Sequence, residues 1–346
     1  MKTGCYTALV TPFTKNDVNL AGLEQLIAFQ IQNGITGILA VGTTGESPTL
    51  SWQEHLTVIE AVIKRAKGKC LTIAGTGSNN TKEAISASVH AADAGVDAVL
   101  LVDPYYNGPS SLEIRKEYIA PIAAAVPNIT VIPYIIPGRT GCQLQPQDVA
   151  ILHQQFSNVT AVKEATGNLD NMRLTRRYAG EKLQILSGDD GIAIEMMTDP
   201  TIAASGVISV ASNIVPKFMT EAVLLVANGE WAEASAVFQK LAPLFNLVTV
   251  TTMEDSNFGP VLCRARNPLA TKTLMAILGM PVGPCRQPLG KMTANGIETI
   301  VAAAKEIWQN SPEIFQPIAE FFNVDIEKRL NDSRSWQDLV YASYTD

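Results

Sequence analysis

The sequence predicts an α/β protein with a (β/α)8 TIM barrel and a C-terminal helical appendage. Short apolar, β-branched segments recur along the first part of the chain, an amphipathic helical pattern follows each of them, and eight such units occur before the pattern changes. Continuously apolar strands suit a parallel sheet that is covered on both faces, and eight units in about 210 residues suit a closed barrel. A doubly wound open sheet is the alternative, but no G-x-G-x-x-G follows the first strand.

Eight strands are expected from the apolar runs. They are Thr7–Val10, Gly37–Val41, Leu71–Ala74, Ala98–Val102, Thr130–Tyr134, Val159–Lys163, Leu183–Ser187 and Ala204–Ser209. Helical patterns separate them, for example L-E-Q-L-I-A-F-Q-I after the first strand. Another begins at Ser51 with Glu54 three residues later, which is the spacing of a capping box.

The character of the chain changes after the eighth unit. Residues 1–212 are therefore expected to form the barrel and catalytic domain, and residues 213–346 a C-terminal helical region with an atypical tail. Strand-like runs become rare in this region, and the segment after Ser311 has no pattern that assigns it to an element.

Composition excludes several classes of function. The net charge of −7 argues against nucleic-acid binding, which needs a basic surface. No apolar run approaches the roughly 20 residues of a membrane span, and no signal peptide is recognised, so a cytoplasmic protein is expected. The five cysteines are scattered without a C-x-x-C pair, and the three histidines are far apart, so no metal site is expected.

The strand ends carry the candidate chemistry, because active sites of such barrels lie at the carboxyl ends of the strands. The sixth strand ends on Lys163. A lysine buried at the barrel mouth has a lowered pKa, and its neutral amine attacks a carbonyl to form a Schiff base. A lysine after a strand is more often a solvated terminus, so this reading depends on the neighbouring strand ends.

Those neighbouring ends form a coherent set. Gly42-Thr43-Thr44-Gly45 follows the second strand and is suited to hold a carboxylate with backbone amides and hydroxyls. Tyr134 and Tyr106 supply phenols for proton transfer, and Arg139 offers a planar fork for a second carboxylate. Each has an ordinary structural reading when taken alone. Asp189 and Asp190 are expected to cap the next helix, Glu164 to be structural, and Cys142 to lie near the mouth without a lowered pKa.

The order of these segments resembles the dihydrodipicolinate synthase family, whose members are also called 4-hydroxy-tetrahydrodipicolinate synthases, within the pyruvate-dependent class I aldolase-like enzymes. The resemblance runs from about Thr7 to Val210. Its motifs are T-A-L-V-T-P-F, G-T-T-G-E-S-P-T-L, D-P-Y-Y-N, R-T-G-C, V-K-E-A-T-G-N, L-S-G-D-D and G-V-I-S-V.

The resemblance implies a lyase of lysine and diaminopimelate biosynthesis, which condenses pyruvate with L-aspartate 4-semialdehyde to (4S)-4-hydroxy-tetrahydrodipicolinate. Lys163 would form the pyruvate Schiff base, with Tyr134 as the central acid/base group and Thr44 in a proton relay. Thr43 and Thr44 would hold the pyruvate carboxylate, and Arg139 the carboxylate of the semialdehyde. Gly188 and the Ile208 carbonyl would line the pocket. No metal or external cofactor is implied.

The resemblance also implies an oligomer and a regulator. The family is typically a homotetramer built from tight dimers, in which Tyr106 would enter the site of a neighbouring subunit. A feedback site for L-lysine lies at the tight-dimer interface, and its matching positions are Ser47, Pro48, Trp52, His55, Asn79, Glu83 and Tyr105. A tryptophan at position 52 suits packing against the stem and ammonium group of lysine.

The chain departs from the family pattern in three places. The segment from Thr252 to Lys272 keeps only part of the family's N-P-x-x-x-K pattern. The usual Y-N-x-P after the fifth strand reads Tyr134-Ile135-Ile136-Pro137, and the chain continues past the usual end through Ile314 to Asp346. A pyruvate aldolase with a different acceptor, such as a sugar acid or acylneuraminate, therefore stays open. A non-catalytic sensor of a 2-oxo acid or lysine is the other alternative.

Overall fold

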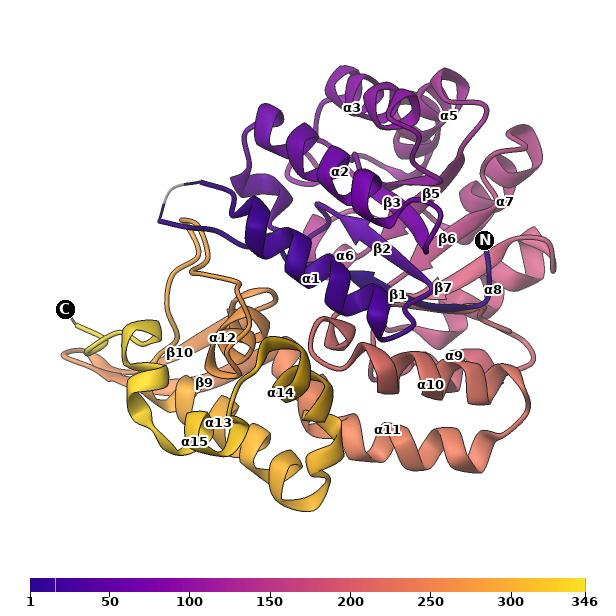
Figure 1. Ribbon diagram of the computed structural model, residues 1–346. Coiled ribbons are helices and arrows are strands. Elements are labelled where there is room, and N and C mark those ends of the chain that lie inside the picture. The colour runs from indigo at the N-terminus through magenta and orange to yellow at the C-terminus, as the bar shows by residue number, and fades with distance from the viewer. Residues whose placement is uncertain (16, 346) are drawn as a thin grey trace.

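The computed structural model describes residues 1–15 and 17–345 and contains a closed barrel of eight parallel strands (Figure 1). The strands pair in chain order, and β8 returns to pair with β1. This confirms the predicted (β/α)8 barrel, and the strand ends differ from the predicted ones by at most three residues. The strands are β1 Gly4–Ala8, β2 Gly37–Ala40, β3 Leu71–Gly75, β4 Ala98–Val102, β5 Thr130–Ile135, β6 Ala161–Glu164, β7 Gln184–Ser187 and β8 Gly206–Ser209.

Helices surround the barrel and bury their apolar faces against it. They are α1 Leu20–Gln32, α2 Trp52–Ala66, α3 Thr81–Asp93, α4 Ser111–Glu113 continued by η2 Ile114–Ile119 and α5 Ala120–Ala125, α6 Pro137–Thr140, α7 Pro146–Gln155, α8 Leu169–Ala179, α9 Ala193–Thr198 and α10 Pro216–Ala227. The predicted capping box of α2 is confirmed: the Ser51 hydroxyl accepts from the Glu54 amide, and the Glu54 carboxylate accepts from the Ser51 amide.

Two apolar clusters follow from the alternation of side chains along the strands. One fills the layer between sheet and helices. The other fills the barrel interior with residues such as Tyr6, Leu39, Ile132 and Leu186. The interior is therefore solid, and open space for chemistry remains only at its ends.

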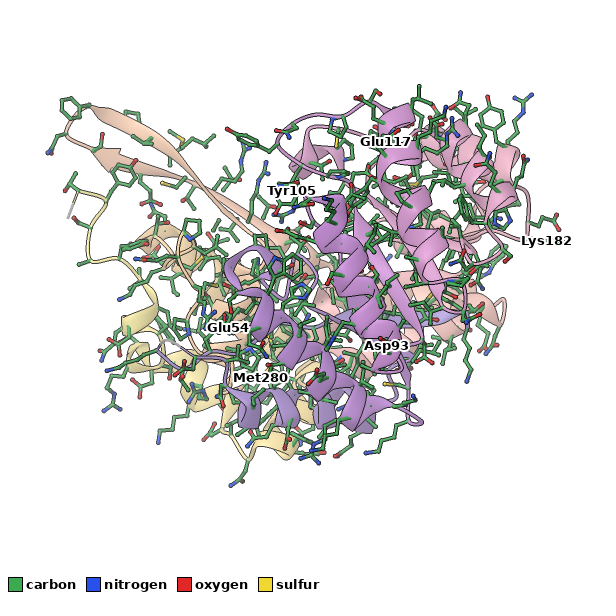
Figure 2. All side chains as sticks on the ribbon, turned by 90° about the horizontal axis from the view of Figure 1, so that it is seen from above. Glu54, Asp93, Tyr105, Glu117, Lys182 and Met280 are labelled. Carbon is green, nitrogen blue, oxygen red and sulfur yellow. The ribbon has the colours of Figure 1, made fainter. Side chains whose placement is uncertain are left out.

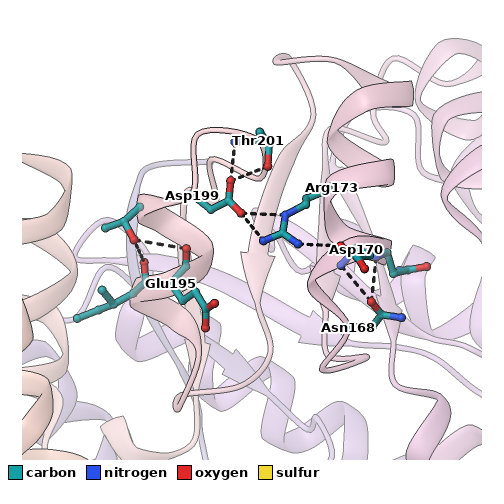
Figure 3. A network of polar contacts seen from close by, with 9 residues as sticks. Asn168, Asp170, Arg173, Glu195, Asp199 and Thr201 are labelled. Atoms are coloured by element: carbon teal, nitrogen blue, oxygen red, sulfur yellow. Dashed lines mark hydrogen bonds and ion pairs between the residues drawn. The ribbon is translucent and has the colours of Figure 1, made fainter.

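A polar network ties α8 to the turn after α9 on the outside of the barrel (Figure 3). The Arg173 guanidinium donates to Asp199 at 2.8 and 3.0 Å and to Asp170 at 2.7 Å. Asp199 also accepts from the amide and hydroxyl of Thr201, and these bonds together lower its pKa to about 2. The network fixes the connection into β8 from outside.

The C-terminal region packs beside the barrel (Figure 1) and contains a hairpin that the sequence analysis did not predict. Strands β9 Thr249–Ser256 and β10 Gly259–Arg266 form a separate antiparallel pair, which Figure 2 shows as an arm that extends from the body. The surrounding elements are α11 Trp231–Phe245, η4 Asn246–Val248, α12 Leu269–Ile277 and α13 Ala294–Asn310.

The tail that had no assignment folds into short helices. They are η5 Pro312–Ile314, α14 Gln316–Phe322, α15 Ile326–Asn331, η6 Ser333–Ser335 and η7 Gln337–Leu339. Phe321 and Phe322 of α14 pack on Phe29 of α1, with ring centroids 5.4 and 5.2 Å away. Arg329 donates to the carbonyls of Ala276 and Ile277 at the end of α12. The tail is thus joined to both the barrel and the C-terminal region.

No helix within residues 1–15 and 17–345 is long and apolar enough to cross a membrane.

Candidate active site

A cleft of about 450 Å³ opens at the carboxyl ends of the barrel strands. Six of the predicted site residues line it together: Thr43, Thr44, Tyr134, Arg139, Lys163 and Gly188. They come from four different βα connections, so only the closed barrel brings them to one place.

Lys163 lies near the end of β6 with its side chain inside the barrel, and only 4% of the residue is exposed. Its Nζ lies 4.2 Å from the centroid of the Tyr134 ring. Burial lowers the Lys163 pKa to about 7, with the Asp190 carboxylate opposing the shift and the Arg139 guanidinium adding to it. A substantial fraction of this amine is therefore neutral near neutral pH.

Tyr134 lies on β5, where it pairs in register with Lys163 on β6. Burial raises the pKa of its phenol to about 12, against the opposing effects of Arg139 and of hydrogen bonding with the Thr43 side chain. The phenol thus keeps its proton at neutral pH, which suits a group that donates and recovers a proton during a reaction.

The G-T-T-G loop after β2 is held in an unusual backbone conformation. Val41 and Glu46, which flank the loop, have φ angles of 49° and 57°, a region that side chains with a Cβ rarely adopt. The buried Glu46 carboxylate accepts from Lys272 Nζ at 2.7 Å and from the Arg286 amide at 2.9 Å. These contacts from the C-terminal region hold the loop that carries Thr43 and Thr44.

Asn267, directly after β10, joins two of the predicted residues. Its Nδ2 donates to Thr44 Oγ1 at 2.9 Å, and its carbonyl accepts from Arg139 Nη2 at 3.0 Å. Its Oδ1 is buried and has no hydrogen-bond partner among the described residues. Asn267 begins an N-P-x-x-x-K segment, but no pattern in the sequence predicts a role for it in the site.

Gly188 follows β7 and lies against the lysine. A Cβ placed on Gly188 would be 3.0 Å from Lys163 Cε and 2.7 Å from the Ala165 Cβ, so a side chain would displace the lysine. Ile208 is buried in the barrel interior, and the residues that line the cleft on that side are Ala8 and Val210.

The two aspartates after β7 do not cap α9, contrary to the sequence-based expectation. Asp190 is buried, and its Oδ2 accepts from the amides of Val210 and Ala211 at 3.0 and 2.8 Å, at the start of the short helix η3 Ala211–Asn213. Asp189 accepts from the Gly191 amide within its own turn. Both aspartates line the cleft with Lys163. The Asp190 carboxylate acts on the Lys163 pKa, an effect that the sequence did not predict.

Two further expectations concern Cys142 and Glu164. Burial raises the pKa of the Cys142 thiol, and the thiol donates to the Pro104 carbonyl. Glu164 is buried on the opposite face of β6 from Lys163 and accepts from Thr166 and Asn171. Neither residue lines the cleft.

Ile135 also lies outside the cleft. Alternation along β5 turns Tyr134 into the barrel and Ile135 outward, where it is buried in the layer between sheet and helices. Ile136 is the residue that lines the cleft. The missing asparagine therefore removes no group from the cleft lining, and the sequence-based reason for an altered acceptor is wrong.

Tyr106 is not brought to this cleft. It follows β4 with a φ of 82° and is 94% exposed. Its side chain therefore lies free on the surface of the single chain, away from Thr44 and Tyr134.

A second pocket lies between the G-T-T-G-E-S loop, α2 and α3. All seven residues predicted for a lysine site line it: Ser47, Pro48, Trp52, His55, Asn79, Glu83 and Tyr105. The Trp52 and His55 rings lie 5.0 Å apart, and burial lowers the His55 pKa to about 4, so this imidazole is neutral. The Glu83 carboxylate accepts from the Ser78 hydroxyl at 2.6 Å and is the one carboxylate in the lining.

A central cavity connects the two sites. It shares Thr43, Tyr134 and Arg139 with the catalytic cleft, and Ser47, Pro48 and Tyr105 with the second pocket. The two sites therefore share walls built from the same loops. In the described part of the chain, no group of three or more His, Cys, Asp or Glu side chains gathers as a metal site.

Comparisons with known proteins agree with this geometry. Residues 1–307 match the model of the dihydrodipicolinate synthetase family. A 4-hydroxy-tetrahydrodipicolinate synthase of Methanocaldococcus jannaschii is 40% identical over 293 residues, which are 85% of this chain and 94% of the relative.

Two solved structures are similar over most of their length. Dihydrodipicolinate synthase from Cyanidioschyzon merolae, with lysine bound, is 34% identical with a TM-score of 0.79, and the match covers 88% of this chain and 97% of that one. The Acinetobacter baumannii enzyme, complexed with pyruvate, is 35% identical with a TM-score of 0.80, over 89% and 99% of the two chains. This chain therefore belongs to the dihydrodipicolinate synthetase family.

Proposed function

We propose that this protein is a 4-hydroxy-tetrahydrodipicolinate synthase, a lyase that condenses pyruvate with L-aspartate 4-semialdehyde. The observation that carries the proposal is the buried Lys163 amine against the Tyr134 ring at the barrel mouth. The family membership and the names of the relatives support the same reaction.

The first half of the reaction takes place on Lys163. Its neutral amine attacks the C2 carbonyl of pyruvate, and loss of water gives a Schiff base. Tyr134 donates the proton that lets the C2 oxygen of pyruvate leave as water. The cationic imine then draws electrons from C3, which loses a proton and becomes the nucleophile. Thr43 and Thr44 hold the pyruvate carboxylate, and no metal or external cofactor takes part.

The second half joins the acceptor. C3 attacks the aldehyde carbon of L-aspartate 4-semialdehyde, and the amine of the acceptor displaces the Lys163 nitrogen from C2. The amine of Lys163 is thereby released, and the ring product is (4S)-4-hydroxy-tetrahydrodipicolinate. Arg139 binds the acceptor carboxylate, since a guanidinium matches a carboxylate with two parallel hydrogen bonds. Gly188 gives the lysine room, and the carbonyl of Ile208, a residue buried in the barrel interior, would line the pocket beside it.

A different acceptor is less well supported. Ile135, whose presence raised this alternative, does not line the cleft. A non-catalytic sensor would have no need of a lysine with a lowered pKa beside a protonated phenol.

A coupled assay tests the reaction. The protein is mixed with pyruvate, L-aspartate 4-semialdehyde and dihydrodipicolinate reductase, and the loss of NADPH is followed. We expect a signal that needs both substrates and disappears in Lys163→Ala. Folded protein that is trapped by borohydride with pyruvate but gives no signal would refute this acceptor, and absence of trapping would refute the Schiff base itself.

We further propose that L-lysine inhibits the enzyme from the second pocket. Glu83 would pair with one ammonium group of lysine, Asn79 would bind beside it, and Trp52 would cover the aliphatic stem. The shared walls of the central cavity offer a route by which an occupied pocket changes the positions of Tyr134 and Arg139.

Titration with lysine tests this second proposal. We expect inhibition at about millimolar lysine, as charge-assisted pairing in a polar pocket supplies roughly that affinity. Glu83→Gln should weaken it, whereas Glu117→Gln, which changes an exposed carboxylate on the outer helices, should not. An unchanged rate across this range would contradict the proposal.

The active site is also proposed to depend on a second subunit. We propose a cytoplasmic homo-oligomer, a tetramer or dimer, in which Tyr106 of one subunit completes the proton relay of its neighbour. The exposed position of Tyr106 on a single chain is consistent with that role.

A further inference from the structure

The base of hairpin β9–β10 places one of its two faces at the catalytic cleft. Side chains alternate along each strand, and the register pairs Thr249 with Arg266 and Thr251 with Arg264. These four residues line the cleft together with Lys163 and Arg139. A hairpin absent from the sequence-based expectation therefore forms one wall of the site.

The other face of the hairpin fixes it in place. Val250 is buried, the Thr252 hydroxyl lies 3.3 Å from that of Thr293, and Asn295 donates to the Met253 carbonyl and to Glu254. These contacts join the hairpin to the start of α13. At its base, the Asn267 amide donates to the Val248 carbonyl at 2.8 Å. The cleft-facing side chains are therefore presented from an anchored element.

The cleft face carries two cations without counter-ions. Neither Arg264 nor Arg266 forms an ion pair with a described carboxylate. Both are exposed, and the Arg266 Nη1 donates to the Gly138 carbonyl, next to Arg139, at 3.3 Å. The positive charge of Arg266 reaches Arg139, where it adds to the effect of burial in lowering the pKa of that guanidinium.

Charge in the cleft lining is unevenly distributed. The two carboxylates in the lining are Asp189 and Asp190, and Asp190 Oδ2 accepts from two backbone amides. Three guanidinium groups, those of Arg139, Arg264 and Arg266, line this cleft in a protein of net charge −7. Like charges repel unless an anion lies between them, so this arrangement suits a ligand with a carboxylate.

We propose that hairpin β9–β10 is an acceptor-binding element, in which Arg266 joins Arg139 in holding the carboxylate of the acceptor aldehyde and Arg264 attracts that anion at the entrance. The inference rests on the proposed function, since it assigns the substrate of that site. The ligand class is a small aldehyde that carries a carboxylate. Pyruvate, held deeper by the G-T-T-G loop, does not depend on the hairpin.

Steady-state kinetics on matched variants tests the proposal. Arg266→Gln should raise the KM for L-aspartate 4-semialdehyde about tenfold, the effect of losing one charge-assisted hydrogen bond, and Arg264→Gln about threefold. Arg266→Lys should recover part of the loss. The KM for pyruvate and the yield of the borohydride adduct should stay unchanged. Arg177→Gln, which removes an exposed arginine from the outer helix α8, is the control.

A binding experiment separates this proposal from the proposed function. Lys163 is first capped with pyruvate by borohydride, so that no condensation can follow, and succinate semialdehyde is titrated in by calorimetry. Binding that weakens about tenfold in Arg266→Gln, and not in Arg177→Gln, supports the hairpin site even if the coupled assay fails. Equal binding to both variants, or no binding to the capped parent protein, overturns it even if the coupled assay succeeds.

Discussion

Burial of a single amine is the central feature at the scale of residues. The Lys163 pKa of about 7 predicts that the rate of pyruvate adduct formation rises with pH and levels off above about pH 7, because only the neutral amine is nucleophilic. An unshifted lysine would instead show a rate that still rises at pH 10. Borohydride trapping from about pH 5.5 to pH 9 measures the inflection.

The same experiment has an internal control in Asp190. Its carboxylate raises the Lys163 pKa, so Asp190→Asn should move the inflection to lower pH. A rate that still increases about tenfold per pH unit through pH 9 would show that the lysine is solvated rather than buried.

A second residue-scale prediction concerns the space beside the lysine. Gly188→Ala places a methyl group 3.0 Å from Lys163 Cε, so the amine must move from its position over Tyr134. A misplacement of about 1 Å in a catalytic group costs on the order of a hundredfold in rate. Gly191→Ala is the matched control, because its Cβ would meet only an Asp189 oxygen at 3.4 Å. Equal kcat values in the two variants would contradict the prediction.

Some site residues were predictable from the sequence and others were not. Lys163 and Tyr134 lie at the ends of apolar strands and Arg139 follows one of them in α6, and the barrel places such ends at one mouth. The position of Ile135 was misjudged because alternation along β5, not closeness in sequence to Tyr134, decides which side chain faces the cleft. Asn267 reaches Thr44 across more than 200 residues of chain, and such a contact has no local signal.

At the scale of elements, the buried ion pair between Glu46 and Lys272 joins α12 to the catalytic loop. Both side chains are almost completely buried, and Lys272 Nζ also donates to the carbonyls of Thr11 and Pro284. Lys272→Met leaves a buried carboxylate without its cation, which costs about 3–5 kcal/mol of stability. The G-T-T-G loop should lose its position and activity should fall with it.

Urea unfolding of two variants measures this effect. Adding Glu46→Gln to Lys272→Met removes the buried charge and should recover part of the lost stability. A single variant as stable as the parent protein would show that the pair does not hold the loop.

The strands and the hairpin contrast in how well the sequence specifies them. Each barrel strand is an apolar run that is buried on both faces, which is a strong local signal. The hairpin is half exposed, and its apolar residues alternate with threonine and charged residues. Thr249–Ser256 does have the β-branched, alternating pattern of a strand, and Gly259 has the positive φ of a turn. The helical segments on either side obscured this signal.

At the scale of the whole molecule, the site is completed by a second chain if Tyr106 acts in its neighbour. Mixing inactive Lys163→Ala subunits with weakly active Tyr106→Phe subunits should then restore activity. A hybrid dimer contains one cleft with both Lys163 and Tyr106 intact. The two variants are refolded together, and the rate is compared with the sum of the separate rates. A rate no greater than that sum would contradict a shared site.

The sequence predicts the barrel architecture better than it predicts the packing of the C-terminal tail. Eight strand–helix units specify a closed barrel through local patterns. By contrast, the packing of residues 312–345 depends on contacts of α14 with Phe29 of α1 and of Arg329 with the end of α12. These contacts join segments far apart in the chain, so no periodic pattern in the tail indicates them.

Hairpin β9–β10 is closed at its base. The hairpin begins after Val248 and ends before Asn267, and a backbone hydrogen bond joins these two flanking residues. All of its strand pairing is internal, so no barrel strand depends on it for register. The hairpin is thus paired only with itself, and replacing residues 249–266 by a short turn between Val248 and Asn267 should remove one wall of the cleft without changing the register of any barrel strand.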